Sequence, residues 1–593
     1  MSIGTAALGP TGEESQPRTR VRISLIADSL GKLGWPAFWI VLVFVLFVPT
    51  ACFLVLSVSP HLFGQGSSWF TLSSFQDAFK GTTLEGMRNS LLVGLLSALG
   101  ASTIAIGLSW VMQRTTFPGR SIWSVGIWAI LLVPSYIIAA GWQVVLGRGG
   151  VLSSVGLFSS GLQNLFFGPA GYALVLTIRG VPFAYFAIAA SLAALGRSYE
   201  DAARIHGARR LGTLRTVGPI LSPAIFAAMI IVFAESISDF GTAAVIAPDS
   251  HFPVATYSLY TALSAYPANF GIASVIGIML VVAVGVALFV QSRLTRGRSY
   301  AVLSGRSRPA IPQPLSRAGA IGVCVFMVGF FLAALVVPIL GAVAASMLTP
   351  LTTFSLSHLS VDAYHGILSS SVFGAPIALS LKLALINAFL ALVMGTLIAR
   401  RISARRSDAI SKVLNLTLVA AIALPAIVLA AGFIFAYNLP ILSSMGIHLY
   451  GTVVVLAMAY LAGSLPSTSR VLLGPMAQIH ASLLSAARVH GSGLVASWRK
   501  AVLPLLGTVL VWAWLFAFAT TFLELPASEL LSPPGMKTVS VAIMQILNKS
   551  DMYRGAALSV VALGIDLGVV VVVLVAFRLL SPKGWRRIGA RGM

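Results

Sequence analysis

Long apolar runs recur along the chain and alternate with short polar segments. We expect about twelve membrane spans of about twenty or more residues each. They lie near residues 35–58, 90–112, 121–146, 170–195, 219–246, 270–292, 317–347, 377–399, 410–436, 447–468, 502–523 and 555–579. A run of this length crosses the hydrocarbon core of a bilayer as one helix. The pattern therefore predicts an all-α, polytopic membrane protein.

The composition excludes a soluble globular protein. The mean hydropathy is +0.93, and 57% of the residues are hydrophobic while 9% are charged. The net charge of +23 would suit a nucleic-acid partner, but most of the 39 basic residues lie in connections on one side of the expected spans. That placement follows the positive-inside rule, which puts both termini in the cytoplasm. We therefore expect lipid, not nucleic acid, around this chain.

The order of features in the first half of the chain is repeated in the second half, which predicts two pseudo-symmetric six-helix domains. A proline interrupts the third span of each half, Pro134 and Pro425, and either bends the helix for packing or serves as a hinge. The expected organisation is a cytoplasmic tail at 1–34, a first domain at 35–292, a basic proline-containing linker at 293–316, a second domain at 317–580 and a cytoplasmic tail at 581–593.

Two polar islands on the cytoplasmic side are near copies of each other. The first reads Asp-Ala-Ala-Arg-Ile-His-Gly and ends at Gly207, and the second reads Ser-Ala-Ala-Arg-Val-His-Gly and ends at Gly491. The two glycines are 284 positions apart, about half the chain. Small residues followed by glycine predict a short helix, a break and a second helix that starts at an angle.

These islands resemble the E-A-A-x3-G-x9-I-x-L-P loop of bacterial ATP-binding-cassette importer permeases. In that family the loop forms a coupling helix that docks on the ATPase subunit. The resemblance places coupling loops at 200–223 and 484–507. The residues that it assigns to coupling are Glu200, Asp201, Ala202, Ala203, Gly207, Pro219, Ser485, Ala486, Ala487, Gly491, Leu503 and Pro504. Pro219 comes one residue early and Ser485 replaces the acid, so the equivalence of the two docking sites stays open.

The resemblance implies a transport subunit and not an enzyme. The chain contains no G-x-x-x-x-G-K-[ST] motif that could hold ATP phosphates, so ATP would be used by partner subunits. The implied partners are two copies of the ATPase and a periplasmic solute-binding protein, in a bacterial inner membrane. No cofactor or metal site is expected on the chain itself. An ion-coupled secondary transporter with six-plus-six topology remains the alternative, although it would have no use for the islands.

Two acidic residues lie at equivalent distances from the islands. Asp239 follows Pro219 by 20 residues, and Glu524 follows Pro504 by 20 residues. A helix advances about 30 Å over that length, which is the thickness of the bilayer core. We therefore place both acids at the outer mouth of a pathway, with Glu235 one turn deeper. They could instead be solvated loop residues or contacts for a docking protein.

The sign of the solute's charge stays open at this point. Outer carboxylates favour a cation, whereas Arg179, at membrane depth, would suit an anion or pair with another helix. The strings around Asp239 and Glu524 resemble fused permeases that serve ferric iron, thiamine and aminoethylphosphonate. The resemblance puts ferric iron first, ahead of thiamine, aminoethylphosphonate or a polyamine.

Overall fold

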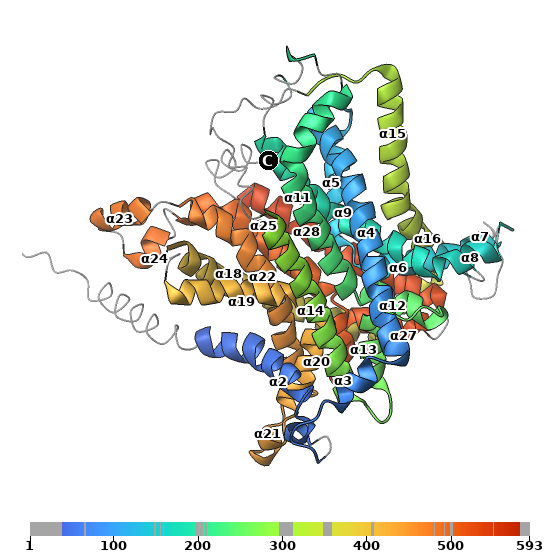
Figure 1. The fold of residues 1–593 in the computed structure, drawn as a ribbon, viewed down its shortest axis with the longest axis vertical. Helices are drawn as coiled ribbons and strands as arrows, with labels where there is room; N and C mark the ends of the chain where they lie inside the picture. Colours follow the sequence, from blue (N-terminus) through green and yellow to red (C-terminus); the bar gives the residue numbers. More distant parts are fainter. Residues whose placement is uncertain are drawn as a thin grey trace, which may run out of the picture.

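The computed structural model describes residues 38–64, 67–147, 150–154, 156–157, 159–195, 201, 205–207, 210–295, 312–347, 359–404, 408–479, 481–491, 493–498, 502–548 and 551–580. These residues form helices and no β-strand (Figure 1). The expected tails at 1–34 and 581–593, and most of the linker at 293–316, lie outside the described residues.

The first half contains η1 (Val43–Phe47), α2 (Val48–Leu56), η2 (Pro60–Phe63), α3 (Ser73–Ala78), α4 (Gly81–Arg114), α5 (Arg120–Leu132), α6 (Ser135–Leu146), α7 (Val151–Ser154), α8 (Ser160–Phe166), α9 (Pro169–Ala194), α11 (Arg210–Ser238), α12 (Gly241–Ile246), η3 (Ala247–Asp249), α13 (Ala255–Ser264) and α14 (Phe270–Thr295).

The second half contains α15 (Arg317–Phe331), η4 (Leu332–Val336), α16 (Val337–Ser346), α17 (Asp362–Ser369), α18 (Ser371–Ala404), α19 (Ala409–Ala423), α20 (Ala426–Tyr437), α21 (Pro440–Ser444), α22 (Val453–Ala477), α23 (Ala481–Val489), α24 (Leu494–Ser497), α25 (Leu503–Phe522), α26 (Pro526–Leu531), α27 (Val539–Asn548) and α28 (Met552–Leu580).

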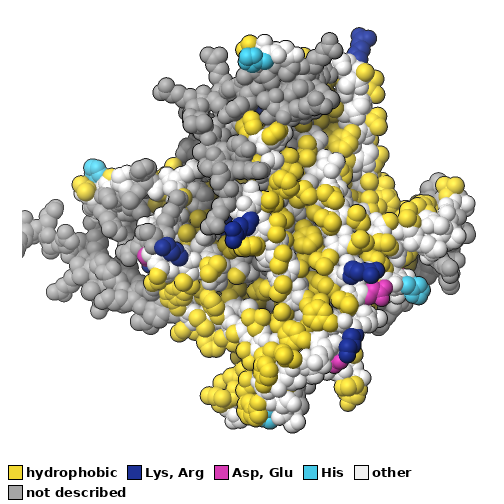
Figure 2. Space-filling view, viewed as in Figure 1, with side chains coloured by type: hydrophobic (Ala, Val, Ile, Leu, Met, Phe, Trp, Pro, Cys, Tyr) yellow, Lys and Arg dark blue, Asp and Glu magenta, His cyan; other side chains and the backbone are white. Residues whose placement is uncertain are grey.

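The described helices support a multi-pass membrane protein. Ten of them are long and apolar enough to cross a bilayer, and the bent pair formed by α5 and α6 is an eleventh candidate. The sequence predicted about twelve spans, and the differences lie in the second half. Helix α19 is short, and α22 has the length of a span but is more polar, with Ser464, Ser467 and Thr468 in its middle. Hydrophobic side chains cover much of the face seen in Figure 2, as lipid contact requires.

Both predicted proline interruptions are full helix breaks. Helix α5 ends before Pro134 and α6 starts after it, and the same holds for α19, Pro425 and α20. Proline has no N–H to continue the helix and disfavours helical backbone in the residue before it. Each half therefore contains a short, separate helix, α6 or α20, most of whose residues are buried.

The first span of each half packs against the opposite half. Helix α2 lies on α20, and α16 lies on α6. Both contacts use a glycine: a Cβ on Gly141 would lie 2.3 Å from the carbonyl oxygen of Pro338, and a Cβ on Gly432 would lie 2.6 Å from that of Pro49. The helices approach this closely because glycine has no side chain, as is common between membrane helices. Because the first span of each half packs on the other half, these contacts hold the two halves together.

We expect Gly141→Ala and Gly432→Ala each to lower the stability of the protein. The added methyl group must displace a backbone carbonyl, and overpacking of this kind costs about 1–3 kcal/mol. Gly285→Ala in α14 is the matched control, because nothing lies within 4 Å of its missing Cβ. The midpoint of heat-induced loss of the size-exclusion peak should fall for the first two variants and not for the control. Equal midpoints for all three would contradict the close packing.

Candidate functional site

Both island glycines have the left-handed backbone expected of a helix break. Gly207 has φ +77° and Gly491 has φ +74°, and α23 ends two residues before Gly491. Other residues pay about 1–2 kcal/mol for this conformation. Of the residues assigned to coupling, Glu200, Ala202 and Ala203 lie outside the described residues.

Each island exposes a large apolar side chain just before its glycine. Ile205 is 84% exposed and Val489 is 85% exposed. Because they are 284 positions apart, like the two glycines, they occupy the same place in the repeat. Both side chains lie in the polar islands, outside the long apolar helices.

The islands differ after the glycine. Pro219 lies inside α11, which runs without interruption from Arg210 to Ser238, whereas Leu503 and Pro504 form the first turn of α25. Ala486 is exposed and Ala487 is half-buried on α23, the short helix of the second island. Pro219 is therefore nine residues beyond the first residue of α11, whereas Pro504 is the second residue of α25.

Asp239 and Glu524 hold equivalent positions, and each caps a short helix. Asp239 accepts hydrogen bonds from the N–H of Thr242 (2.7 Å) and the hydroxyl of Ser135 (2.6 Å). Glu524 accepts from the N–H groups of Ala527 (2.8 Å) and Ser528 (3.0 Å). The first N–H groups of a helix have no partner within it, so the two carboxylates supply one for α12 and α26.

The same repeat extends to the next helix. The carbonyl of Asp239 accepts a hydrogen bond from Thr256 (3.0 Å), and the carbonyl of Glu524 accepts one from Ser540 (2.5 Å). Thr256 is the second residue of α13, and Ser540 is the second residue of α27. Asp239 thus connects the end of α11 to α12 and α13, and Glu524 connects the end of α25 to α26 and α27.

Arg179 donates hydrogen bonds to backbone carbonyls where the helix breaks at Pro134. Its guanidinium donates to the carbonyls of Leu131 (2.6 Å) and Ile130 (3.5 Å) at the end of α5. Proline cannot donate to the Ile130 carbonyl as the next turn of a helix would. Arg179 therefore has a structural role at this site, which weakens its interpretation as an anion ligand.

Glu235 stands apart from these capping contacts. It lies in α11 with an exposed side chain, and its counterpart Thr520 in α25 is also exposed. A carboxylate within a membrane helix is costly unless it faces water, a cation or an opposite charge. Arg179 lies close enough to attract it electrostatically.

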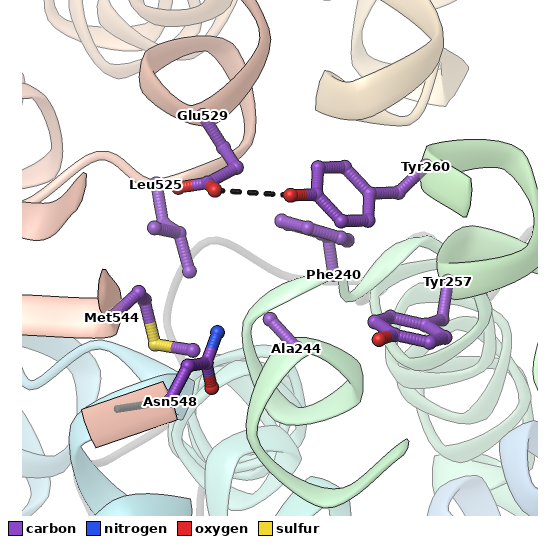
Figure 3. Close-up of a pocket in the computed structure, with 8 residues that line it drawn as sticks. All are labelled: Phe240, Ala244, Tyr257, Tyr260, Leu525, Glu529, Met544 and Asn548. Carbon is purple, nitrogen blue, oxygen red and sulfur yellow. Dashed lines mark hydrogen bonds between the residues drawn. The ribbon is translucent and has the colours of Figure 1, made fainter. Parts of the chain in front are cut away.

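A small pocket of about 30 Å³ lies where the two halves meet on α12, α13, α26 and α27 (Figure 3). Its lining residues are Phe240, Ala244, Tyr257, Tyr260, Leu525, Glu529, Met544 and Asn548. The hydroxyl of Tyr260 donates to Glu529 across the boundary between the halves, at 3.1 Å. Burial raises the pKa of Glu529 and raises that of Tyr260 to about 12.

Residues 98–299 match the family model described as binding-protein-dependent transport system inner membrane component. This stretch contains the first island, the break at Pro134 and the capping residue Asp239. This part of the chain is therefore similar to the membrane components of binding-protein-dependent transport systems.

Similarity to other proteins extends over most of the chain. The ferric transport system permease protein FbpB of Actinobacillus pleuropneumoniae is 24% identical over 82% of this chain and 69% of its own length. The putative ferric transport system permease protein FbpB 1 of Haemophilus influenzae is 25% identical over 78% of this chain and 70% of its own. The sulfate transport system permease protein CysT of Salmonella typhimurium is 28% identical over 32% of this chain and 69% of its own.

Sequence reasoning did not single out the pocket of the permease. Glu529 lies in the string around Glu524 but was given no role, and Tyr260 and Asn548 belong to no motif that the sequence indicated. One signal was available: the offset of 285 that relates Asp239 to Glu524 also relates Ala244 to Glu529. An acid at one member of an otherwise apolar pair could have marked the position.

Proposed function

We propose that this permease is the membrane subunit of an ATP-driven importer of ferric iron. A binding protein delivers the ion to the outer side, and ATPase subunits bind the two islands on the cytoplasmic side, where both termini also lie. The observation that carries the proposal is the pair of islands. Each has a left-handed glycine beside an exposed apolar side chain, in a chain similar to ferric permeases.

The islands support an ATPase partner on physical grounds. Ile205 and Val489 would be buried by docking, and full burial of such a side chain contributes about 1.5–3 kcal/mol. Both project from the same place in the repeat, so two copies of one partner could bind in the same way. An ion-coupled secondary transporter would gain nothing from two such surfaces.

A pathway between the halves would pass Glu235. This residue and Thr520 are exposed at equivalent points of α11 and α25, one turn before the capped breaks at Asp239 and Glu524. A carboxylate there favours a cation over an anion. The carboxylates of Asp239 and Glu524 are already used in hydrogen bonds that cap helices. We therefore assign them a structural role at the outer mouth and assign the contact with solute to other residues.

Thiamine, aminoethylphosphonate, a polyamine and the sulfate suggested by CysT remain weaker candidates. Sulfate would need buried donors, and Arg179 already donates to two backbone carbonyls. The pocket of about 30 Å³ has room for an ion or a water molecule, and not for an organic solute in this conformation.

Uptake of radioactive iron by iron-starved cells tests this function. The cells lack their own ferric importers and express the permease with its binding protein and ATPase. We expect ATP-dependent uptake that is lost when the permease gene is deleted or when ATP is depleted. Unchanged uptake after deletion would overturn the iron assignment. Competition with unlabelled thiamine, aminoethylphosphonate, spermidine or sulfate would show which other solute is carried.

A further inference from the structure

The hydrogen bond between Tyr260 and Glu529 joins the far ends of two long helices. Helix α11 follows the first island and α25 follows the second, so each helix begins on the island side. A helix advances 1.5 Å per residue, and the 20 residues of α25 therefore span about 30 Å. Tyr260 lies in α13 and Glu529 in α26, which come after the far ends of α11 and α25. The hydrogen bond thus lies at the opposite end of these helices from the islands.

Each partner of this hydrogen bond is attached to the end of its own long helix. Asp239 directly follows α11, and its carbonyl accepts from Thr256 in α13, one turn before Tyr260. In the second half, Glu524 lies two residues after α25 and caps α26, the helix that carries Glu529. A movement of α11 or α25 is therefore passed to one side of the hydrogen bond.

The two halves meet closely beside this hydrogen bond. The pocket next to it has a volume of about 30 Å³, which is room for a water molecule. The ring of Phe240 packs on the ring of Tyr260, with centroids 5.3 Å apart. Figure 3 shows the hydroxyl of Tyr260 directed at the carboxylate of Glu529 from the other half. In this conformation the ends of the two halves away from the islands are in contact.

The contact has favourable and unfavourable parts of similar size. Tyr260 keeps its proton to donate, because burial raises its pKa to about 12, and a hydrogen bond to a carboxylate is stronger than one between neutral groups. Against this, Oε2 of Glu529 is buried and has no hydrogen-bond partner among the described residues. An unpaired buried oxygen costs about as much as one such hydrogen bond contributes. Water reaches Oε2 when the halves separate, so the joined and separated arrangements are close in free energy, as a switch requires.

We propose that the hydrogen bond between Tyr260 and Glu529 is a latch that holds the outer ends of the two halves together until a movement of the islands separates α11 from α25. The proposal rests on the importer architecture of the proposed function, and not on the identity of the solute. The latch regulates that function: it keeps ATP hydrolysis low while no binding protein is docked, because the halves must part before the cycle can proceed.

ATP hydrolysis by the permease–ATPase complex in lipid nanodiscs, without binding protein, tests the latch. Tyr260→Phe removes the donor and keeps the ring. We expect hydrolysis by this variant to rise about tenfold, because the loss of a hydrogen bond to a charged group shifts an equilibrium by about that factor. Glu529→Ala should raise it similarly, and the double variant should show no further rise. An unchanged rate in Tyr260→Phe would refute the latch.

Tyr364→Phe is the matched control for this assay. The hydroxyl of Tyr364 is hydrogen-bonded to that of Ser346 at 2.5 Å, and both residues lie in the second half. The variant therefore loses a similar hydrogen bond that does not join the halves, and its rate of hydrolysis should equal that of the wild type. A rise equal to that of Tyr260→Phe would also refute the latch, because general loosening would then explain both.

Labelling of a cysteine in the pocket measures the separation of the halves directly. Ala244→Cys is introduced into a chain in which Cys52 and Cys324 are replaced by alanine, and a membrane-impermeant maleimide is added from outside. Ala244 is buried, so labelling requires the halves to part. We expect labelling about tenfold faster when Tyr260→Phe is added, and an unchanged rate when Tyr364→Phe is added. Equal rates in all three chains would contradict the latch.

Iron uptake by the wild type separates this proposal from the proposed function. If the wild type carries iron and Tyr260→Phe changes neither hydrolysis nor labelling, the latch is refuted and the iron function stands. If Tyr260→Phe raises both rates and the wild type carries no iron, the latch stands and the iron assignment is overturned. A chain that binds no ATPase at its islands would overturn both.

Discussion

Replacing Gly207 and Gly491 together with valine is expected to abolish ATP-driven uptake while the membrane helices stay folded. Both glycines have left-handed backbone, at φ +77° and +74°. Valine is branched at Cβ and is a severe outlier in this region. The strain of about 1–3 kcal/mol at each island would be relieved by a change in the direction of the short helix. The ATPase would then lose its contact or fail to transmit its movement.

The measurements are iron uptake in cells and co-purification of the ATPase with the permease. Gly446→Val is the matched control, because Gly446 has φ +74° and open space around it but lies beside α21, far in the sequence from both islands. This control carries the same backbone strain and should keep its uptake. Normal uptake by the double variant would exclude a coupling role for the islands. An equal loss of uptake in the Gly446→Val control would show that backbone strain anywhere in the protein has the same effect.

The second large effect is expected from removing the capping carboxylates, and it depends on the replacement. Glu524→Ala leaves the N–H groups of Ala527 and Ser528 without a partner, at a cost of about 1–3 kcal/mol for each buried group. Glu524→Gln keeps one of the two acceptor oxygens, so one N–H group stays paired and the variant should cost less than alanine. Asp239→Ala and Asp239→Asn form the corresponding pair in the first half, since asparagine is as good a cap as aspartate.

The yield of folded protein and iron uptake should therefore change together. Both alanine variants should lose most of the folded protein, Asp239→Asn should keep the fold and most of the transport, and Glu524→Gln should lie between the two. An acid that binds the solute would behave differently. Amide variants that fold normally but carry no iron would contradict the capping role. They would indicate instead that Asp239 and Glu524 contact the solute.

The sequence predicted the long helices, the repeat and the islands because these features are local. A span needs only a run of apolar residues of bilayer length, and a helix break needs only glycine or proline. The spacing of 20 residues from each island proline also located Asp239 and Glu524 at equivalent places, since a helix has a fixed rise. Their role was not predictable, because a carboxylate that caps a helix and one that binds a solute look alike in the sequence.

Contacts between distant segments decided the rest. The use of Arg179 to cover the carbonyls freed by Pro134 requires α9 to lie beside the end of α5, and the close approach at Gly141 and Gly432 requires each first span to cross to the other half. Glu529 faces Tyr260 across 269 residues of chain. The sequence by itself determined that this is an all-helical, multi-pass membrane protein with two similar polar islands. Only the tertiary structure could bring single, unpatterned residues of the two halves into one pocket, because that depends on how the halves close on each other.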